Sequence, residues 1–396
     1  MMEGTKELTK EANKKLYHET NLRIIFSITL MAVLGVSSIT PAFPKIAQVM
    51  NISQETVGLL ITVFTLPGVI LTPVFGILAD RFGRKRILVP SLILFGIAGG
   101  AGAFTSDFNT LLNLRFIQGI GAAALGSLNS TLIGDIYSGK ERIEAMGYNA
   151  SVLSVGTATY PALGGALAMF GWNFPFILPV LAIPVSFIVL FKLNNPEPEV
   201  SENLLEYLAN AVKSINNKQV YLLFTAGITT FLLLYGAYLS FFPFIIEGTF
   251  GATSLVTGLV MFSMSITNAL TASQLKRLSE RFSVKTLLKV AFLFLALALF
   301  LVPFVNNLWM LLIPALIFGI GQGMNNPSNQ TILAGIAPIE YRAAFMSING
   351  MVLRIGQTLG PLFMGLMFTI GGINLVFFMG AFLALLMSTL LFLFLK

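Results

Sequence analysis

Long apolar runs separated by short polar stretches dominate this chain of 396 residues. Each run has about 20 residues or more, which as a helix is long enough to cross the hydrocarbon core of a bilayer. Because the runs are continuous rather than alternating, they do not fit the strands of a membrane barrel. The expected spans are 22–46, 54–79, 87–105, 108–136, 143–170, 173–193, 220–246, 254–275, 286–305, 308–335, 342–370 and 373–395. The pattern therefore predicts an all-α integral membrane protein with twelve transmembrane helices.

A polar segment at 194–219 divides these spans into two sets of six. Its beginning carries Pro196 and Pro198, which end the preceding helix. Apolar residues then recur at helical spacing, which favours an amphipathic helix on the membrane surface. The predicted organisation is a polar N-terminal segment 1–21, a six-helix bundle 22–193, a linker 194–219 and a second bundle 220–396.

The two sets of spans repeat one another at a shift of 200 residues. The shift superposes identical residues, among them Gly58 on Gly258, Asn129 on Asn329, Pro161 on Pro361 and Gly165 on Gly365. Two six-helix halves in the same orientation, related by an axis along the membrane normal, are one of the repeat patterns of transporters.

Composition and charge agree with this prediction. The chain is 56% hydrophobic and only 10% charged, whereas soluble domains have about a quarter of their residues charged. The net charge of +7 arises from Lys and Arg in the loops of one side, so it predicts cytoplasmic termini in a cell membrane rather than nucleic-acid binding. There is no cysteine and a single histidine, His18, which leaves no thiolate chemistry and no metal site to expect. The sequence also contains no cluster of Ser and His residues that would suggest an enzyme.

A charged block at 76–86 lies between the second and third spans. Its pattern, Gly-x-x-x-Asp-Arg-x-Gly-Arg-Lys, contains Gly76, Asp80, Arg81, Gly83, Arg84 and Lys85. With the six-plus-six spans, it resembles the loop motif of the major facilitator superfamily. The resemblance implies two pseudo-symmetric bundles and a conformational latch, in which Asp80 caps the eleventh helix near Arg342 and Arg84 pairs with Asp135. A carboxylate is favoured at a helix N-terminus. The alternative is that these charges only set the topology.

Two arginines lie within predicted spans, where a charge is costly and usually faces a cavity or a partner. Arg115 resembles the arginine that the family ties to proton transfer, and the alternative is a side chain that reaches the membrane surface. Arg354 lies deeper, with Gln357 on its face, and is predicted to face the central cavity or the interface between halves. The alternative is a structural partner for a polar group on a neighbouring helix.

The fifth span resembles the antiporter motif of this family, Gly-x-x-x-Gly-Pro-x-x-Gly-Gly. It contains Gly156, Tyr160, Pro161, Gly164 and Gly165, with tyrosine where the family has the second glycine. Small residues let helices approach closely, so generic helix packing is the alternative.

The resemblance places the central cavity among the first, fourth, seventh and tenth spans. Helical spacing in the seventh gives an aromatic stripe of Phe231, Tyr235, Tyr238 and Phe242, and the tenth has Gln322, Asn325, Asn326 and Asn329 on about one face. Aromatic groups opposite amides suit amphipathic organic molecules.

The sequence thus predicts a monomeric secondary transporter that exports amphipathic, drug-like small molecules in exchange for protons, by alternating access and without a cofactor. Proton antiport needs a carboxylate that titrates within reach of the cavity. No acid lies in the middle of a predicted span, so Asp135 and Glu247, near span ends, are the candidates. The alternative is a carrier or exporter of a sugar, metabolite or lipid, without obligatory proton coupling, in which Arg354 could bind an anionic substrate.

Overall fold

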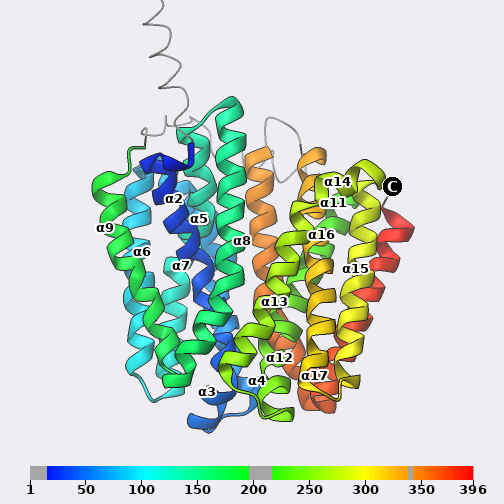
Figure 1. The fold of residues 1–396 in the computed structure, drawn as a ribbon. Coiled ribbons are helices and arrows are strands. Elements are labelled where there is room, and N and C mark those ends of the chain that lie inside the picture. Colours follow the sequence, from blue (N-terminus) through cyan, green and yellow to red (C-terminus); the bar gives the residue numbers. More distant parts are fainter. Residues whose placement is uncertain (1–15, 196–215, 338–341, 396) are drawn as a thin grey trace, which may run out of the picture.

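The computed structural model describes residues 16–195, 216–337 and 342–395, and this part of the chain is built from helices (Figure 1). Eleven helical segments are long and apolar enough to cross a membrane in the described residues. They are Thr20–Val49, Gln54–Phe82, Arg84–Phe104, Phe108–Ile136, Gly139–Phe170, Phe174–Lys192, Lys218–Thr249, Ser254–Ser273, Val284–Phe304, Leu308–Ile336 and Ile348–Phe394. Ten of them follow the predicted spans closely, because the polar loops between apolar runs set their limits.

The helices that form the first half of the chain lie side by side on one side of the molecule, and those of the second half lie on the other (Figure 1). The first group contains α2 (Thr20–Ser37), α3 (Phe43–Val49), α4 (Gln54–Val57), α5 (Leu59–Phe82), α6 (Arg84–Ala101), α7 (Phe108–Ile136), α8 (Gly139–Phe170) and α9 (Ala182–Lys192). The second contains α11 (Lys218–Leu232), α12 (Phe242–Phe244), α13 (Ser254–Ser273), α14 (Leu275–Arg281), α15 (Val284–Leu301), α16 (Leu312–Ile336) and α17 (Arg342–Phe394). The groups meet chiefly where α8 packs on α13 and α5 packs on α17.

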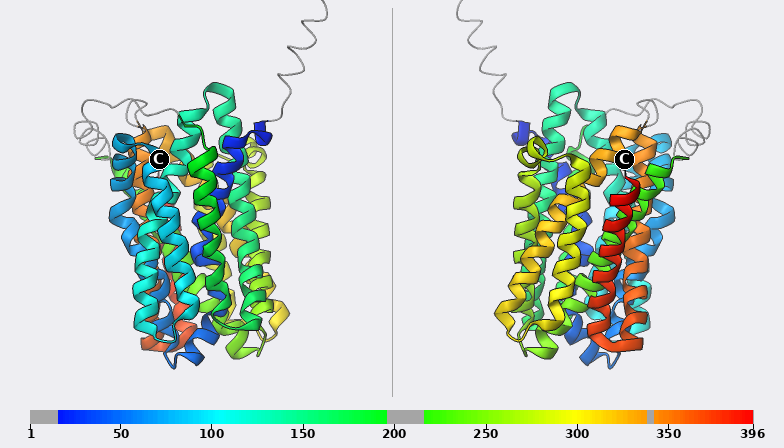
Figure 2. Two further views of the ribbon diagram at one scale, coloured as in Figure 1. Left: turned by 90° about the vertical axis from the view of Figure 1, so that its left-hand side faces the viewer. Right: turned by 90° about the vertical axis from the view of Figure 1, so that its right-hand side faces the viewer.

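Two segments depart from regular α-helix. The chain between α11 and α12 forms a π-helix, η5 (Leu233–Phe241), in the middle of the seventh predicted span. The last segment, α17, is interrupted by non-helical backbone at Gly371 and Gly372, and Gly372 has a φ of 69° that L-residues rarely adopt. This break falls between the eleventh and twelfth predicted spans, and Figure 2 shows the final arm running back along the molecule.

The two ends of the molecule differ in the elements that they carry. One end, called the loop end, has the turn between α5 and α6, the helix α14 and the C-terminus, whereas the opposite end, called the far end, has α3 and α4 (Figure 1). The predicted N-terminal segment is described only from residue 16, and the predicted amphipathic linker helix at 196–215 lies outside the described residues. Both remain predictions.

The two helix groups are in close contact toward the far end. A Cβ atom at Gly58 would approach Pro361 to 3.1 Å, and one at Gly165 would collide with the backbone oxygen of Ser254. Small residues on both groups thus allow backbone-to-backbone contact. A hydrogen bond of 3.1 Å from Thr62 to the carbonyl of Thr358 joins the same surfaces.

The groups separate toward the loop end. Gly68 of α5 packs on Arg354 of α17. About two turns farther along α5, a Cβ atom at Gly76 would meet nothing within 4 Å among the described residues, and the same is true of Gly350, one turn before Arg354. The described conformation is therefore closed at the far end and open toward the loop end.

Candidate functional site

A cavity of about 440 Å³ lies between the two helix groups, near the middle of the helices. Its lining comes from α2, α5, α7 and α8 of the first group and from α11, η5, α13, α16 and α17 of the second. The lining combines aromatic rings, methionines, amides, hydroxyl groups and, among the described residues, one charged side chain, that of Arg354. A mostly apolar concavity with a few polar groups is the usual form of a small-molecule site.

The aromatic wall consists of Phe231, Tyr235 and Tyr238, three of the four predicted positions. The rings of Phe231 and Tyr235 are 5.9 Å apart. Tyr238 is stacked between Phe242 and Phe318, with centroid distances of 4.7 and 4.8 Å. Its hydroxyl group is buried and has no hydrogen-bond partner among the described residues.

Phe242, the fourth predicted position, does not line the cavity. It is buried behind Tyr238 and contacts Phe377 edge-to-face. The prediction assumes α-helical spacing from Tyr235 to Phe242, but this stretch passes through η5. A π-helix bonds residue i to i+5 and has a different angular spacing, so the position seven residues on no longer faces the same way.

The predicted amide face of the tenth span divides into two faces of α16. Gln322 and Asn326 line the cavity, joined by Gln330, which the prediction missed. Asn325 and Asn329, also predicted there, lie outside the lining and face α11. Asn325 accepts a hydrogen bond of 2.8 Å from Thr230, and Asn329 donates one of 3.2 Å to the carbonyl of Leu223.

Arg354 and Gln357 of α17 both line the cavity, as their shared face predicts. The arginine extends across the junction between the groups. A Cβ atom on Gly68 of α5 would lie 3.0 Å from its Nε, and one on Gly126 of α7 would lie 3.5 Å from an η nitrogen. The absence of a side chain at Gly68 thus leaves space for the guanidinium, and Gly126 lies at ordinary contact distance from it.

A polar cluster on the first group also lines the cavity and was missed by the prediction. Thr29 of α2 donates to the side-chain oxygen of Asn149 on α8, and Asn129 of α7 donates to Thr29. All three residues line the cavity. The sequence held a signal for it, because both asparagines have an asparagine 200 residues later, at 329 and 349.

Arg115 is buried but lies outside the cavity lining. Its Nε donates to the carbonyl of Leu60 at 3.1 Å, an η nitrogen donates to Gln118 at 2.7 Å, and the guanidinium lies 4.2 Å from the ring centre of Phe64. These contacts tie α7 to α5. They place the side chain inside the helix group, rather than at the membrane surface.

The charged loop brings Arg84 between two carboxylates. Its Nε donates to Asp135 at the end of α7 with a distance of 2.9 Å, and it also pairs with Asp80 one turn away. Asp135 is 25% exposed and Asp80 is 47% exposed. The predicted contact of Asp80 with the start of the eleventh helix remains a prediction, because residues 338–341 lie outside the described residues.

The rest of the motif shapes this turn. Gly83 has a φ of 97°, which places it in the left-handed region where glycine is favoured, and it separates α5 from α6. Arg81 lies 5.7 Å from the ring centre of Phe82. The ammonium group of Lys85 donates to the carbonyl of Leu190 on α9 at 3.4 Å.

Glu247 and the fifth-span motif lie toward the far end. Glu247 accepts a hydrogen bond of 3.4 Å from Thr257 and is absent from the cavity lining. In the motif, Gly156 and Gly164 pack against α2 and the backbone of Ser38, within their own helix group. Gly165 instead meets α13 of the other group, and Pro161 reaches the cavity, while Tyr160 is buried.

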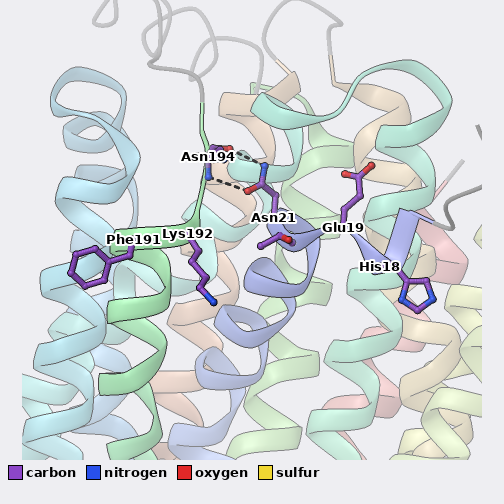
Figure 3. A pocket seen from close by; sticks show the side chains of 7 residues that line it. His18, Glu19, Asn21, Phe191, Lys192 and Asn194 are labelled. Atoms are coloured by element: carbon purple, nitrogen blue, oxygen red, sulfur yellow. Dashed lines mark hydrogen bonds between the residues drawn. The ribbon is translucent and has the colours of Figure 1, made fainter. Parts of the chain in front are cut away.

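A second hollow, of about 480 Å³, opens on the surface at the loop end, between the start of α2 and the end of α9 (Figure 3). Asn21 exchanges two hydrogen bonds with the backbone of Asn194 there, at 2.9 and 3.0 Å. Glu19 accepts one from Tyr137, and burial together with this carboxylate raises the pKa of Tyr137. These contacts fasten the end of α9 to α2, and the hollow shares no described lining residue with the central cavity.

Comparison with known proteins identifies a family, relatives and a solved structure of the same fold. The model of the Major Facilitator Superfamily matches residues 25–253 and 226–396. The chain is 26% identical over 356 residues to the bacillibactin exporter of Bacillus subtilis (strain 168), covering 86% of this chain and 88% of that protein. It is 25% identical over 351 residues to multidrug resistance protein 1 of the same organism, covering 88% and 90%.

One solved structure with the same fold is a bacterial homologue of the human lysosomal transporter Spinster, in an inward-facing and occupied conformation. It superposes with a TM-score of 0.81 at 18% identity, covering 96% of this chain and 97% of that one. At this identity the likeness concerns the fold.

Proposed function

The chain belongs to the major facilitator superfamily, and on that basis we propose that it exports amphipathic, drug-like small molecules in exchange for protons. It is a multi-pass membrane transporter with multidrug exporters among its relatives at low identity, and not an enzyme. The observation that carries the proposal is the central cavity, whose lining combines Phe231, Tyr235 and Tyr238 with uncharged polar groups. Such a lining binds by shape, stacking and weak hydrogen bonds, so it suits varied amphipathic compounds.

The topology that we propose has twelve crossings. The break at Gly371 and Gly372 separates the last two, and six helices on each side of the polar segment 194–219 form two related bundles. Lys and Arg concentrate in the loops that the sequence assigns to the loop end, and by the positive-inside rule this supports a cytoplasmic position for that end and for both termini. The transporter acts as a monomer in the cell membrane, since the cavity is formed within one chain.

Alternating access in this arrangement is a rocking of the two helix groups about the central cavity. The described conformation is closed at the far end and open toward the loop end, so in the proposed topology it faces the cytoplasm. When the loop end closes, the pair of Arg84 with Asp135 would hold the end of α7 against the charged loop, and Asp80 would reach the start of α17. We therefore assign a latch role to this loop.

The proton gradient is the proposed energy source. No carboxylate of the described residues lies in the cavity lining, so the titrating group must act from a distance, and Asp135 and Glu247 remain the candidates. Arg115, bound to the α5 backbone beside the cavity residue Phe64, would transmit its effect through the packing of α5 and α7.

A second candidate function is transport of a metabolite, sugar or lipid without obligatory proton coupling. One observation favours it: among the described residues, the single charge in the cavity lining is a guanidinium, and no acid lines the cavity with it to take up a proton. The two functions differ in their energy source, which can be measured directly.

The test uses the purified chain in proteoliposomes with imposed gradients. Nigericin with potassium collapses the pH gradient, and valinomycin with potassium sets the electrical potential. The proposal expects accumulation of an amphipathic fluorescent compound, tested with an ethidium-type cation and with a permanently charged pyrene sulfonate, to follow the pH gradient, and Glu247→Gln or Asp135→Asn to remove that dependence. Movement that ignores the pH gradient would reject proton exchange, and absence of movement of both compounds would reject the drug-like substrate class.

A further inference from the structure

We propose that the central cavity selects organic anions, with Arg354 binding the carboxylate of an amphipathic substrate whose aromatic body packs on Phe231, Tyr235 and Tyr238. This inference rests on the proposed transport function of the same cavity and narrows its substrate class. It follows from the charge of the cavity, from the position of the guanidinium and from polar groups that lack partners.

The cavity carries one unbalanced positive charge within the described part of the chain. Arg354 is the charged residue in the lining, and neither a hydrogen bond nor an ion pair joins it to another described residue. An isolated charge removed from water loses several kcal/mol of solvation, and intramembrane charges normally pair or face a water-filled path. A substrate carboxylate would provide the missing partner, and a planar guanidinium can bind both of its oxygens at once.

The position of Arg354 suits a ligand-binding role better than a packing role. The side chain starts on α17 and ends against Gly68 and Gly126 of the other helix group. At Gly68 a larger residue would crowd the guanidinium, whereas Gly126 lies at ordinary contact distance from it. An anion bound at this point would therefore contact both groups, so binding and the relative movement of the groups would be linked.

Two further donors without partners line the same cavity. The hydroxyl of Tyr238 and the side-chain amide nitrogen of Gln322 are both buried and unbonded among the described residues. Buried donors without acceptors cost free energy, so they also indicate a ligand that brings acceptor oxygens. The guanidinium, the phenol and the amide N–H are all groups that can donate a hydrogen bond to the oxygens of an anion.

Two fluorescent compounds provide a matched pair for the experiment: 1-pyrenebutyrate and its neutral analogue 1-pyrenebutyramide. Binding is measured by fluorescence titration of the full chain in detergent. We expect the wild type to bind the carboxylate at least roughly tenfold more tightly than the amide, because a buried charge-assisted pair is worth that much or more. Arg354→Gln should remove this preference while binding of the amide stays, and Arg354→Lys should keep part of it.

The control is Arg277→Gln, which removes the same charge from the exposed surface of α14 and should leave the preference unchanged. Gly68→Ala tests the same idea with Arg354 present. Its Cβ would lie 3.0 Å from the guanidinium and displace it, whereas a Cβ atom at Gly147, outside the cavity lining, would meet nothing within 4 Å among the described residues, so Gly147→Ala should leave the preference unchanged. A reduced preference in Gly68→Ala but not in Gly147→Ala would support the inference even if Arg354→Gln folded poorly.

Several outcomes would overturn the inference. Equal binding of both probes by the wild type, a preference that survives in Arg354→Gln, or binding of neither probe would each do so. The proposed export of drug-like molecules has an independent readout in dye movement under imposed gradients. A chain that moves a cationic dye but shows no preference for the pyrene carboxylate would refute the anion site and leave the proposed function standing.

Discussion

At the scale of single residues, Arg84 is held by two carboxylates that differ in their surroundings. Asp135 comes from the end of α7, 51 positions away, and is 25% exposed. Asp80 belongs to the same turn as Arg84 and is 47% exposed. An ion pair that connects distant segments and is less exposed to water is screened less, so its loss lowers the stability of the fold more. Asp80, in the local and more exposed pair, can exchange Arg84 for another partner at a lower cost in stability.

This difference predicts opposite effects of two matched substitutions. Asp135→Asn should lower the stability of the purified chain by about 1 to 2 kcal/mol, because Arg84 loses a charged acceptor between α6 and α7. Asp80→Asn should change stability little and reduce dye efflux, because its proposed role is in the closed loop end. Thermal unfolding in detergent and efflux from cells with matched expression measure the two effects. Full efflux by Asp80→Asn would remove the latch role.

Side-chain contacts that depend on a single motif can be predicted from the sequence. Contacts that depend on how a helix is rotated about its axis can be predicted only in part. The pairing of Arg84 with Asp135 was expected from the loop motif, and the structure brings these side chains together. The amides of α16 show the limit. Residues 322, 326 and 330 face the cavity, but 325 and 329, one step around the helix, bond to α11. Hydropathy cannot separate these faces, since both carry amides.

At the scale of elements, the polar loops fixed the predicted spans well, and the exceptions have local causes. The main exception is the π-helix η5, whose hydrogen bonds add a residue to each turn. No residue pattern in 233–241 predicts this π-helix. Its effect is visible in Ser240, whose hydroxyl donates to the carbonyl of Tyr235 five residues back. Of the stripe predicted with α-helical spacing, Phe231, Tyr235 and Tyr238 therefore line the cavity, whereas Phe242, which follows η5, does not.

The contact between α8 and α13 predicts a substitution that acts on the conformational balance. A Cβ atom at Gly165 would collide with the carbonyl of Ser254, and one at Gly258 with that of Pro161. Gly165→Ala should therefore separate the helices at the far end. We expect slower transport and greater labelling of a single cysteine introduced at the far end, with stability lowered by roughly 1 to 3 kcal/mol, as for other overpacked contacts.

The matched control is Gly147→Ala on the same helix. A Cβ atom there would meet nothing within 4 Å among the described residues, so alanine should be neutral or slightly stabilising through its higher helix propensity. Transport at the wild-type rate by Gly165→Ala, measured beside this control, would show that the close approach of α8 and α13 is dispensable.

At the scale of the whole molecule, hydropathy predicts where the membrane-crossing helices lie along the chain but not which end is open. The reason is physical: two conformations of one transporter use the same apolar faces and differ by only a few kcal/mol, so the pattern of residues is compatible with both. The open end follows instead from contacts, namely those of Gly58 and Thr62 at the far end and the empty surroundings of Gly76 and Gly350.

The closed far end can be locked to test alternating access. The hydroxyls of Thr65 on α5 and Thr358 on α17 lie 2.9 Å apart across the junction, so cysteines at both positions should form a disulfide after a small adjustment. The chain has no cysteine of its own, which makes every cross-link attributable to the introduced pair. Oxidation of Thr65→Cys/Thr358→Cys should stop transport, and reduction should restore it, because the groups can no longer separate at this end.

The controls are the two single-cysteine variants, whose transport should be unaffected by oxidant. Probe binding should persist in the locked protein, since the cavity stays open toward the loop end. Transport at an unchanged rate with the disulfide fully formed would rule out rocking of the two helix groups as the mechanism.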